Sequence, residues 1–260
     1  MSRSTAARIA KRLRPRALRT TTGDGVAWLR LERPHAGNRI TLDLAQALCD
    51  AAAEIEADDT VAVVVLAAAG NDFCLGVEEH GPWEMKADWV DAIARLTRPV
   101  IAAIQGDALA EGCELALACD LRLVSDRAHF ALPQLSMGRL PMHGGTQRLP
   151  RIIGRMRALD LLLTGRTIDA AEAATMGLVA QVVPPKDFER ALAVLANQLK
   201  DKGPIALRFA KEAVVKGSDL SLDQGIRLEE DLYVLLQTTR DRREGIRAFV
   251  EKRTPVFRGE

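Results

Sequence analysis

Short runs of apolar residues alternate with segments of helical periodicity along the first two thirds of the chain. Residues 25–32 alternate apolar and polar positions, which indicates a half-buried strand that stops before Pro34. Residues 60–69 (TVAVVVLAAA) are continuously apolar and rich in valine, as in a strand that is covered on both faces. Three further strands are expected at residues 99–105, 120–124 and 178–183.

Between and after these runs, apolar residues recur with the spacing of an α-helix. The pattern predicts helices at residues 42–55, 113–119, 157–164 and 170–176, the last two followed by a glycine. From Asp187 onward the pattern is helical only, with helices predicted at residues 188–200, 204–216, 221–238 and 240–252. We therefore divide the chain into a strand-and-helix core at residues 21–186 and a helical region at residues 187–260.

Residues 1–20 form a basic extension. They include seven Lys and Arg side chains, and no acidic residue precedes Asp24. An Arg-rich segment without acids also suits an organellar targeting peptide, and this alternative stays open. Because the chain has no apolar signal core and no run of about 18 apolar residues, we expect neither secretion nor a membrane span but a cytoplasmic protein.

The composition narrows the range of partners. Apolar residues make up 48% of the chain and charged residues 27%, a balance typical of a globular domain with a buried core. The net charge of +1 gives no reason to expect nucleic acid or a membrane surface as a partner. The four cysteines have no CxxC spacing, so neither a disulfide framework nor a metal site is predicted. Motifs typical of dinucleotide binding, phosphate-loop NTPases, serine hydrolases and zinc proteases are absent.

Eight short segments contain most of the residues suited to chemistry. They are LERPHAGN (31–38), NDFCLGV (71–77), RPVIAAIQG (98–106), GCELALACD (112–120), FALPQ (130–134), GGTQRL (144–149), LTG (163–165) and AFVEKR (248–253). In this order and near this spacing they resemble the enoyl-CoA hydratase/isomerase (crotonase) family. The resemblance covers the chain from near Thr22 to its end. It implies an α/β fold, a spiral of strand-and-helix units with a C-terminal helical tail.

The resemblance also implies a substrate and an assembly. The substrate is an acyl-CoA thioester, and because coenzyme A is part of that substrate, no separate cofactor is expected. The helical region at 187–260 packs on neighbouring subunits in such proteins, so a homotrimer or homohexamer is expected.

In this family, enolate charge develops on the thioester oxygen, and two backbone N–H groups stabilise it. Loss of one such donor costs about 2.7–4 kcal/mol. The resemblance assigns the donors to Val77, which follows Gly76, and to Glu111. Relatives usually have glycines at the three positions that read Ala110-Glu111-Gly112 here. Two interpretations of the Glu111 side chain stay open: an acid that suits the helix dipole and points to solvent, or a direct role in the pocket.

Two glutamates perform acid–base chemistry in the family, and this chain matches only one of them. Glu114, at the start of an apolar helix, matches the glutamate that handles the water nucleophile. The second, which moves the α-proton, corresponds to Gln134. An amide cannot transfer a proton at neutral pH, although it can orient a water molecule. His143 is a candidate substitute because imidazole titrates near pH 7. The group Glu78, Glu79 and His80 is a second candidate.

For the coenzyme, the resemblance indicates residues on three segments. His35 and Arg39 can pair with phosphate, and the segment that begins at Val77, with Glu78, Glu79 and His80, borders the pantetheine. Phe249 and Lys252 are expected to come from a neighbouring subunit. Between Val77 and Arg98 the chain is shorter than in relatives, which predicts a reshaped acyl pocket in which Trp83 fills part of the gap.

Three hypotheses about function follow. The first is hydration or dehydration of a 2-enoyl-CoA by Glu114 and a backbone oxyanion hole. The second is another crotonase-type reaction on an acyl-CoA, such as isomerisation, hydrolysis or decarboxylation. The third is a catalytically weak subunit that binds acyl-CoA, because Gln134 replaces the second glutamate. Fold alone does not separate these hypotheses.

Overall fold

The computed structural model describes residues 17–78 and 88–260 of the chain. Most of the predicted basic extension, together with Glu79, His80 and Trp83, lies outside the described residues. The order of helices and strands confirms the predicted α/β class with a helical C-terminal region.

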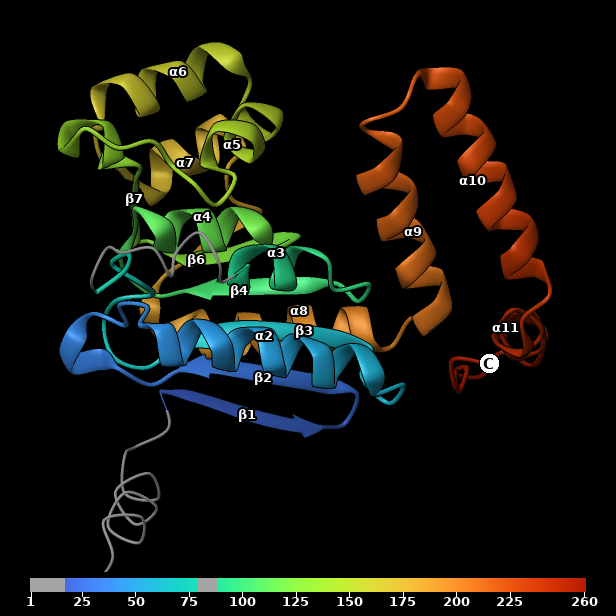
Figure 1. Ribbon diagram of the computed structural model, residues 1–260. Helices are drawn as coiled ribbons and strands as arrows, with labels where there is room; N and C mark the ends of the chain where they lie inside the picture. The colour runs from blue at the N-terminus through green and yellow to red at the C-terminus, as the bar shows by residue number, and fades with distance from the viewer. Residues whose placement is uncertain (1–16, 79–87) are drawn as a thin grey trace, which may run out of the picture.

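A six-stranded sheet forms the centre of the molecule (Figure 1), in the strand order β1-β2-β3-β4-β6-β9. Its strands are β1 (Leu18–Gly23), β2 (Val26–Leu31), β3 (Val63–Ala68), β4 (Val100–Ile104), β6 (Leu121–Ser125) and β9 (Gln181–Val183). β1 lies antiparallel to β2, and every other neighbouring pair is parallel. The sequence pattern assigns residues 18–20 to the basic extension, but pairing with β2 makes them the start of β1.

Alternate residues of β3 show why its apolar run is continuous. Val64 and Leu66 pack in one apolar cluster, with α2 (Leu42–Ala57), α3 (Trp89–Ala94) and α4 (Glu111–Ala118). Val63 and Val65 pack in a second cluster, with α8 (Phe188–Lys200). Because side chains of a strand point alternately to the two faces, a strand between two helical layers needs apolar residues at every position.

A second, three-stranded sheet adjoins the N-terminus of α4. It has the order β5-β7-β8 and consists of β5 (Ala108–Leu109), β7 (His129–Ala131) and β8 (Ile168–Asp169). None of these short strands is predicted from the sequence, because two or three residues are too few to show a period. β5 runs directly into α4, so this small sheet fixes where that helix begins.

The described helices include three that lie above α4 in Figure 1: α5 (Gly145–Ile153), α6 (Arg155–Thr164) and α7 (Ala170–Met176). Short 3-10 helices η1 (Pro34–Ala36), η2 (Pro133–Met137) and η3 (Pro185–Asp187) connect other elements. Gly165 and Gly177 follow the ends of α6 and α7, as predicted, and both adopt the left-handed conformation.

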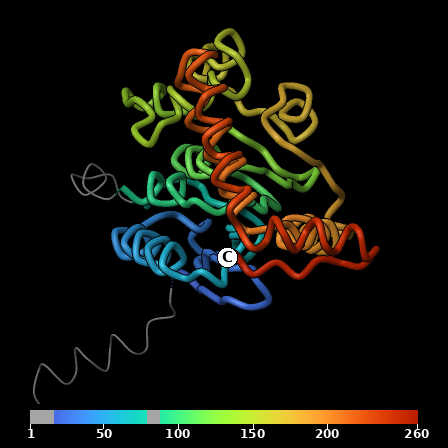
Figure 2. The backbone as a smooth tube through the Cα atoms, turned by 90° about the vertical axis from the view of Figure 1, so that its right-hand side faces the viewer, coloured from blue at the N-terminus to red at the C-terminus, as the bar shows by residue number. Residues whose placement is uncertain are grey.

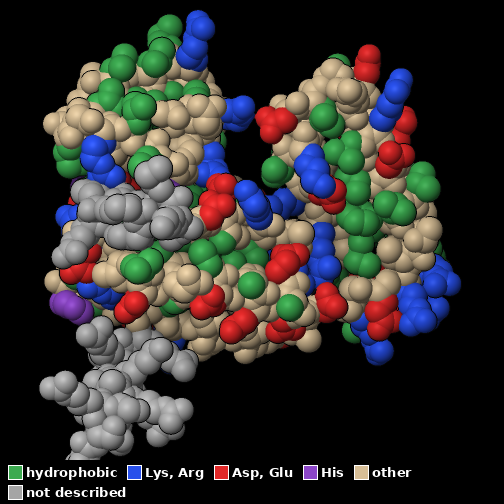
Figure 3. Space-filling view, in the orientation of Figure 1, with side chains coloured by type: hydrophobic (Ala, Val, Ile, Leu, Met, Phe, Trp, Pro, Cys, Tyr) green, Lys and Arg blue, Asp and Glu red, His purple; other side chains and the backbone are tan. Residues whose placement is uncertain are grey.

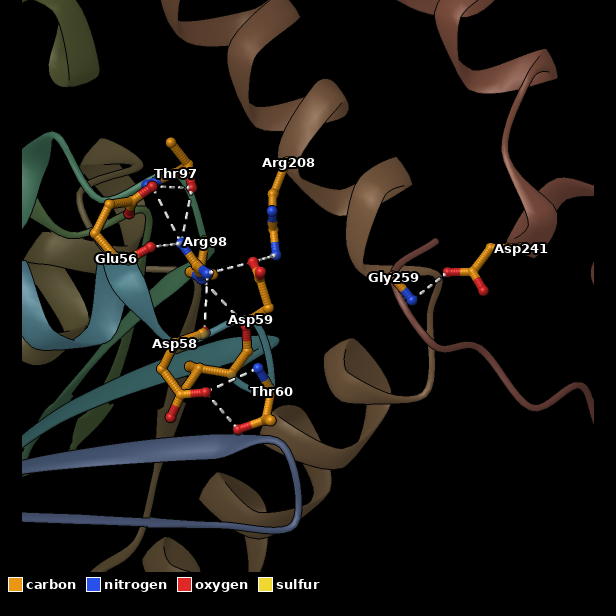
Figure 4. A network of polar contacts seen from close by, with 10 residues as sticks. Glu56, Asp58, Asp59, Thr60, Thr97, Arg98, Arg208, Asp241 and Gly259 are labelled. Atoms are coloured by element: carbon orange, nitrogen blue, oxygen red, sulfur yellow. Dashed lines mark hydrogen bonds and ion pairs between the residues drawn. The ribbon is translucent and has the colours of Figure 1, made fainter.

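The C-terminal helices α9 (Pro204–Gly217), α10 (Leu222–Gln237) and α11 (Arg240–Glu251) extend from one side of the core (Figures 1 and 2). Only a few described contacts join α9 to the core. Lys211 Nζ lies 2.7 Å from Asp120 Oδ2, and Arg208 lies 3.6 Å from Asp59, beside the buried guanidinium of Arg98 (Figure 4). A cavity of about 1010 Å³ separates α9 from α4 and α5.

Hydrophobic side chains gather on the surface of α9 and α10 (Figure 3). The most exposed large ones of these two helices are Leu222, Val214, Val234, Tyr233 and Leu235. α9 has no buried residue, and α10 has only Leu232. Contiguous exposed apolar surface of this kind is typical of a surface that another protein covers. Among the described residues, no helix is both long enough and apolar enough to cross a bilayer.

Candidate active site

The backbone N–H of Val77 points toward the start of α4. The neighbouring groups pair with Ile40 instead: Ile40 N donates to Gly76 O and Glu78 N donates to Ile40 O, both at 2.9 Å. Because Ile40 and Val77 form a parallel bridge, the N–H of Val77 faces away from Ile40. Arg39 supports the segment, since its Nη1 donates to Leu75 O at 2.7 Å and to Val77 O at 3.4 Å.

The start of α4 lies close against the same segment. A Cβ added to Gly112 would be 2.0 Å from Cys74 O, so only glycine allows this approach. Ala110 precedes the helix with φ 51° and ψ −121°, a positive-φ conformation that is unfavourable for a residue with a Cβ. Glu111 is the first residue of α4, so its N–H has no acceptor within the helix. The two predicted backbone donors, Val77 and Glu111, therefore belong to adjoining segments.

The side chain of Glu111 occupies one of these donors. Val77 N donates to Glu111 Oε2 at 3.2 Å, and Arg139 Nη2 lies 3.6 Å from Glu111 Oε1. Glu111 is only 3% exposed. The interpretation of this residue as an acid that points to solvent is therefore wrong. Its carboxylate is part of the buried site.

Glu114 lies one helical turn further along α4 and is fully buried. Its Oε1 accepts from two backbone donors, His143 N at 2.7 Å and Gly145 N at 2.8 Å. Its Oε2 accepts from Gln134 Nε2 at 3.2 Å. The structure thus brings together three of the predicted site residues, Glu114, Gln134 and His143.

The environment of Glu114 suits an acid–base group. Burial is the largest influence and raises the pKa of this carboxyl from 4.5 to about 7. The hydrogen bonds from Gly145 and His143 and the charge of Arg148 lower the pKa, while the charge of Glu111 raises it. A carboxyl with a pKa near 7 can both accept and release a proton at neutral pH.

Gln134 is buried in η2 and makes one described contact with Glu114. Its Oε1 is buried and has no hydrogen-bond partner among the described residues. A buried acceptor without a partner costs about 1–3 kcal/mol, so such an atom is a natural position for a water or substrate donor. Gln134 therefore has the geometry to orient a molecule beside Glu114, although it cannot transfer a proton.

The loop before α5 holds Glu114 through its backbone. The contact with Glu114 comes from the backbone N–H of His143 and not from its imidazole. The imidazole ring lies 5.0 Å from the Trp89 ring, at 54°. Arg148 Nη1 donates to His143 O at 2.5 Å, and Arg148 Nη2 pairs with Asp91 Oδ1. A Cβ on Gly145 would be 3.1 Å from Glu114 Oε1. Gly145, Arg148 and Asp91 were not predicted as site residues, although the first two lie in the GGTQRL motif.

The predicted coenzyme-binding residues do not all lie at this centre. His35 is exposed on η1, and Glu78 is exposed and pairs with Arg33 at 2.5 Å. Arg39 uses its guanidinium to brace the Val77 segment. Phe249, at the end of α11, is 84% exposed, and Lys252 follows that helix. Within one subunit, α11 lies at the outer end of the C-terminal helices, away from α4, the helix that contains Glu114 (Figure 1).

The buried thiols are not suited to nucleophilic chemistry. Burial raises the pKa of the Cys74 and Cys113 thiols to about 12, so both stay protonated at neutral pH. All four cysteines are free. Among residues 17–78 and 88–260, no three His, Cys, Asp or Glu side chains form a metal-binding group.

These features define a class of site: a buried carboxyl with a raised pKa next to backbone N–H groups at the start of a short helix. The chain belongs to the enoyl-CoA hydratase/isomerase family, whose profile matches residues 21–260. The predicted family resemblance is confirmed.

Individual relatives and solved structures agree with this membership. A 2,3-dehydroadipyl-CoA hydratase from Escherichia coli is 36% identical over 244 residues, which span 90% of this chain and 95% of that protein. A protein named probable enoyl-CoA hydratase from Rhizobium meliloti is 39% identical over 246 residues, 90% of this chain and 94% of that protein. The crystal structure of an enoyl-CoA hydratase from Bacillus anthracis matches with a TM-score of 0.90 and 36% identity, covering 94% of this chain and 100% of that one. The predicted crotonase-like fold is therefore confirmed.

Proposed function

We propose that the protein adds water to, or removes it from, a 2-enoyl-CoA thioester, with Glu114 as its principal acid–base group. The observation that supports this most directly is the position of Glu114: buried, with a pKa of about 7, one oxygen fixed by two backbone N–H groups and the other beside Gln134. Coenzyme A enters as part of the substrate, and the proposal includes no further cofactor.

In the proposed reaction, Glu114 carboxylate accepts a proton from a water molecule whose oxygen forms a bond to C3 of the enoyl group. The electron pair of the C2–C3 double bond moves toward the thioester oxygen, where the N–H groups of Val77 and Glu111 stabilise the charge. C2 then takes a proton, which Glu114 returns because Gln134 has none to give. The Gln134 Oε1 atom orients the water by accepting its second hydrogen.

A catalytically weak acyl-CoA-binding subunit is the second candidate. The observation in its favour is the hydrogen bond from Val77 N to Glu111 Oε2, which uses one of the two donors that the reaction needs. The first candidate is preferred because Glu114 is buried and hydrogen-bonded in a manner that a mere binding protein does not require.

A substrate screen tests the proposal. Purified protein is mixed with several enoyl-CoA esters, crotonyl-CoA among them. Loss of the ultraviolet absorbance of the conjugated thioester reports turnover, and mass spectrometry identifies the hydrated product. We expect hydration by the wild type and none by Glu114→Gln, with CoA-ester binding retained. Turnover that survives in Glu114→Gln assigns the proton transfer to another residue and contradicts the proposal.

A further inference from the structure

The contact between Glu111 and Val77 has two consequences for ligand binding. A backbone N–H donates well to one acceptor at a time, so a thioester oxygen cannot use Val77 N while Glu111 Oε2 lies 3.2 Å from it. The Glu111 carboxylate also fills the space next to Gly76, the residue before Val77. A Cβ added to Gly76 would lie 2.8 Å from the same Oε2 atom.

The environment of Glu111 stabilises this position. Arg139 Nη2, 3.6 Å from Oε1, partly compensates the buried negative charge. A hydrogen bond to a carboxylate is roughly twice as strong as one to a neutral carbonyl. A ligand oxygen that replaces Glu111 at Val77 N therefore competes with a stronger, charge-assisted hydrogen bond. The Glu111 carboxylate also has to move to another position.

We propose that Glu111 determines which ligands the site accepts: its carboxylate occupies the Val77 donor in the unliganded protein, and a thioester carbonyl binds by displacing it. This inference rests on the proposed function, since it requires an acyl-CoA site. It adds that affinity for the acyl part is reduced by the cost of moving Glu111. Free coenzyme A has no thioester oxygen, so its binding does not involve this donor.

Three variants isolate the carboxylate. Glu111→Ala removes it and keeps a Cβ at the helix start. Glu111→Gln keeps the size and an acceptor oxygen but removes the charge. Ala110→Gly is the matched control, because it relaxes the neighbouring residue with positive φ (51°) and leaves the carboxylate in place. Thermal unfolding of each variant verifies that it is folded.

Isothermal titration with butyryl-CoA, a saturated thioester that cannot be hydrated, and with coenzyme A measures the effect. For Glu111→Ala we expect butyryl-CoA to bind about tenfold more tightly or better, because a charged competitor at the donor is gone. Glu111→Gln should lie between Glu111→Ala and wild type, and Ala110→Gly should equal wild type. Coenzyme A affinity should be the same for all four proteins.

The remaining outcomes separate this inference from the proposed function. Equal or weaker butyryl-CoA binding by Glu111→Ala, or an equal gain for coenzyme A, overturns the displacement of Glu111. If the expected gain appears but no enoyl-CoA is turned over, the inference stands and the proposed reaction is wrong. If no variant binds either ligand, both are wrong.

Discussion

Gln134 Nε2 donates a hydrogen bond to Glu114 Oε2 at 3.2 Å, and both side chains are fully buried. The amide stands at the position where the family resemblance implies a second glutamate. One carboxyl and one amide share this contact without repulsion, whereas two ionised carboxylates at such a distance would disfavour each other. The pair therefore gives the site one proton-transferring group, and it suggests a direct test by substitution.

Gln134→Glu should raise crotonyl-CoA hydration above the wild-type rate. The new carboxyl would share a proton with Glu114 and could deliver it to C2, and general acid help amounts to about 10²–10⁴ in rate. The gain is expected in kcat more than in KM, since binding contacts to the coenzyme are unchanged. Gln134→Met, of similar size, is the control for packing and should not gain. A rate at or below wild type for Gln134→Glu would show that the amide is not a handicap.

The pKa of Glu114 predicts how activity depends on pH. As a base, the group has to be ionised, so kcat/KM should rise as the pH increases through about 7. A profile that is flat between pH 6 and pH 8 would assign the base to another group. Steady-state rates in buffers of constant ionic strength provide the measurement.

The same pKa predicts an opposite trend in stability. A carboxyl whose folded pKa is raised from 4.5 to about 7 binds its proton more tightly in the folded state, so its stabilising contribution is complete below pH 4.5 and is lost as the pH rises through about 7. The loss is about 3 kcal/mol by linkage. When unfolding by urea is measured at pH 5 and at pH 8, the free energy of unfolding of wild type should fall by most of this amount relative to that of Glu114→Gln. An unchanged difference between the two proteins would contradict the raised pKa.

The predictability of the fold follows the length of each element. The strands at β3 and β4 and the helices α7 and α8 were predictable because continuous apolar runs and helical periods extend over several residues. β1 was not, because its residues LRTTTG, exposed except for Leu18, lack a hydrophobic pattern, and their pairing partner is the next strand. α5 was missed as well, since glycines begin it and Pro150 lies inside it.

The site, too, could be predicted from the sequence only in part. Glu114 and Gln134 were identified by their motifs, and both lie at the buried centre. The side-chain position of Glu111 could not be predicted, because a residue type at a helix start does not tell whether a neighbouring segment closes over it. The role of the loop at 141–145 depends on backbone N–H groups, which are common to all residues except proline and leave no trace in the sequence.

Arg148 should act on the reaction by positioning rather than by contact with substrate. Its guanidinium holds His143 O at 2.5 Å and pairs with Asp91, and the N–H of His143 fixes Glu114. Arg148→Ala should lower kcat by about tenfold or more with little change in KM, because a small misplacement of a reacting group is costly. Asp91→Asn should have a smaller effect in the same direction.

Two further measurements distinguish positioning from general destabilisation. Arg148 also lowers the pKa of Glu114, so its loss should move the midpoint of the pH–rate profile upward. Arg151→Ala, on the same helix and exposed, is the control and should leave the midpoint where it is. If Arg148→Ala lowers the unfolding temperature but leaves kcat and the midpoint unchanged, the residue has only a structural role.

The exposed apolar side chains of α10 predict self-association. Leu222, Tyr233 and Val234 are each more than 60% exposed, and the described contacts of α9 and α10 with the core are sparse and polar. We expect a trimer or hexamer by light scattering at micromolar concentration, as the family resemblance implies. Val234→Asp should shift the protein toward monomer, because a carboxylate in a buried apolar interface is unfavourable. Asp231→Lys, an exposed change on the same helix, should leave the mass unchanged. If wild type is already a monomer, α9 and α10 do not form a subunit interface, and the expected contribution of Phe249 and Lys252 from a neighbouring subunit is then also wrong.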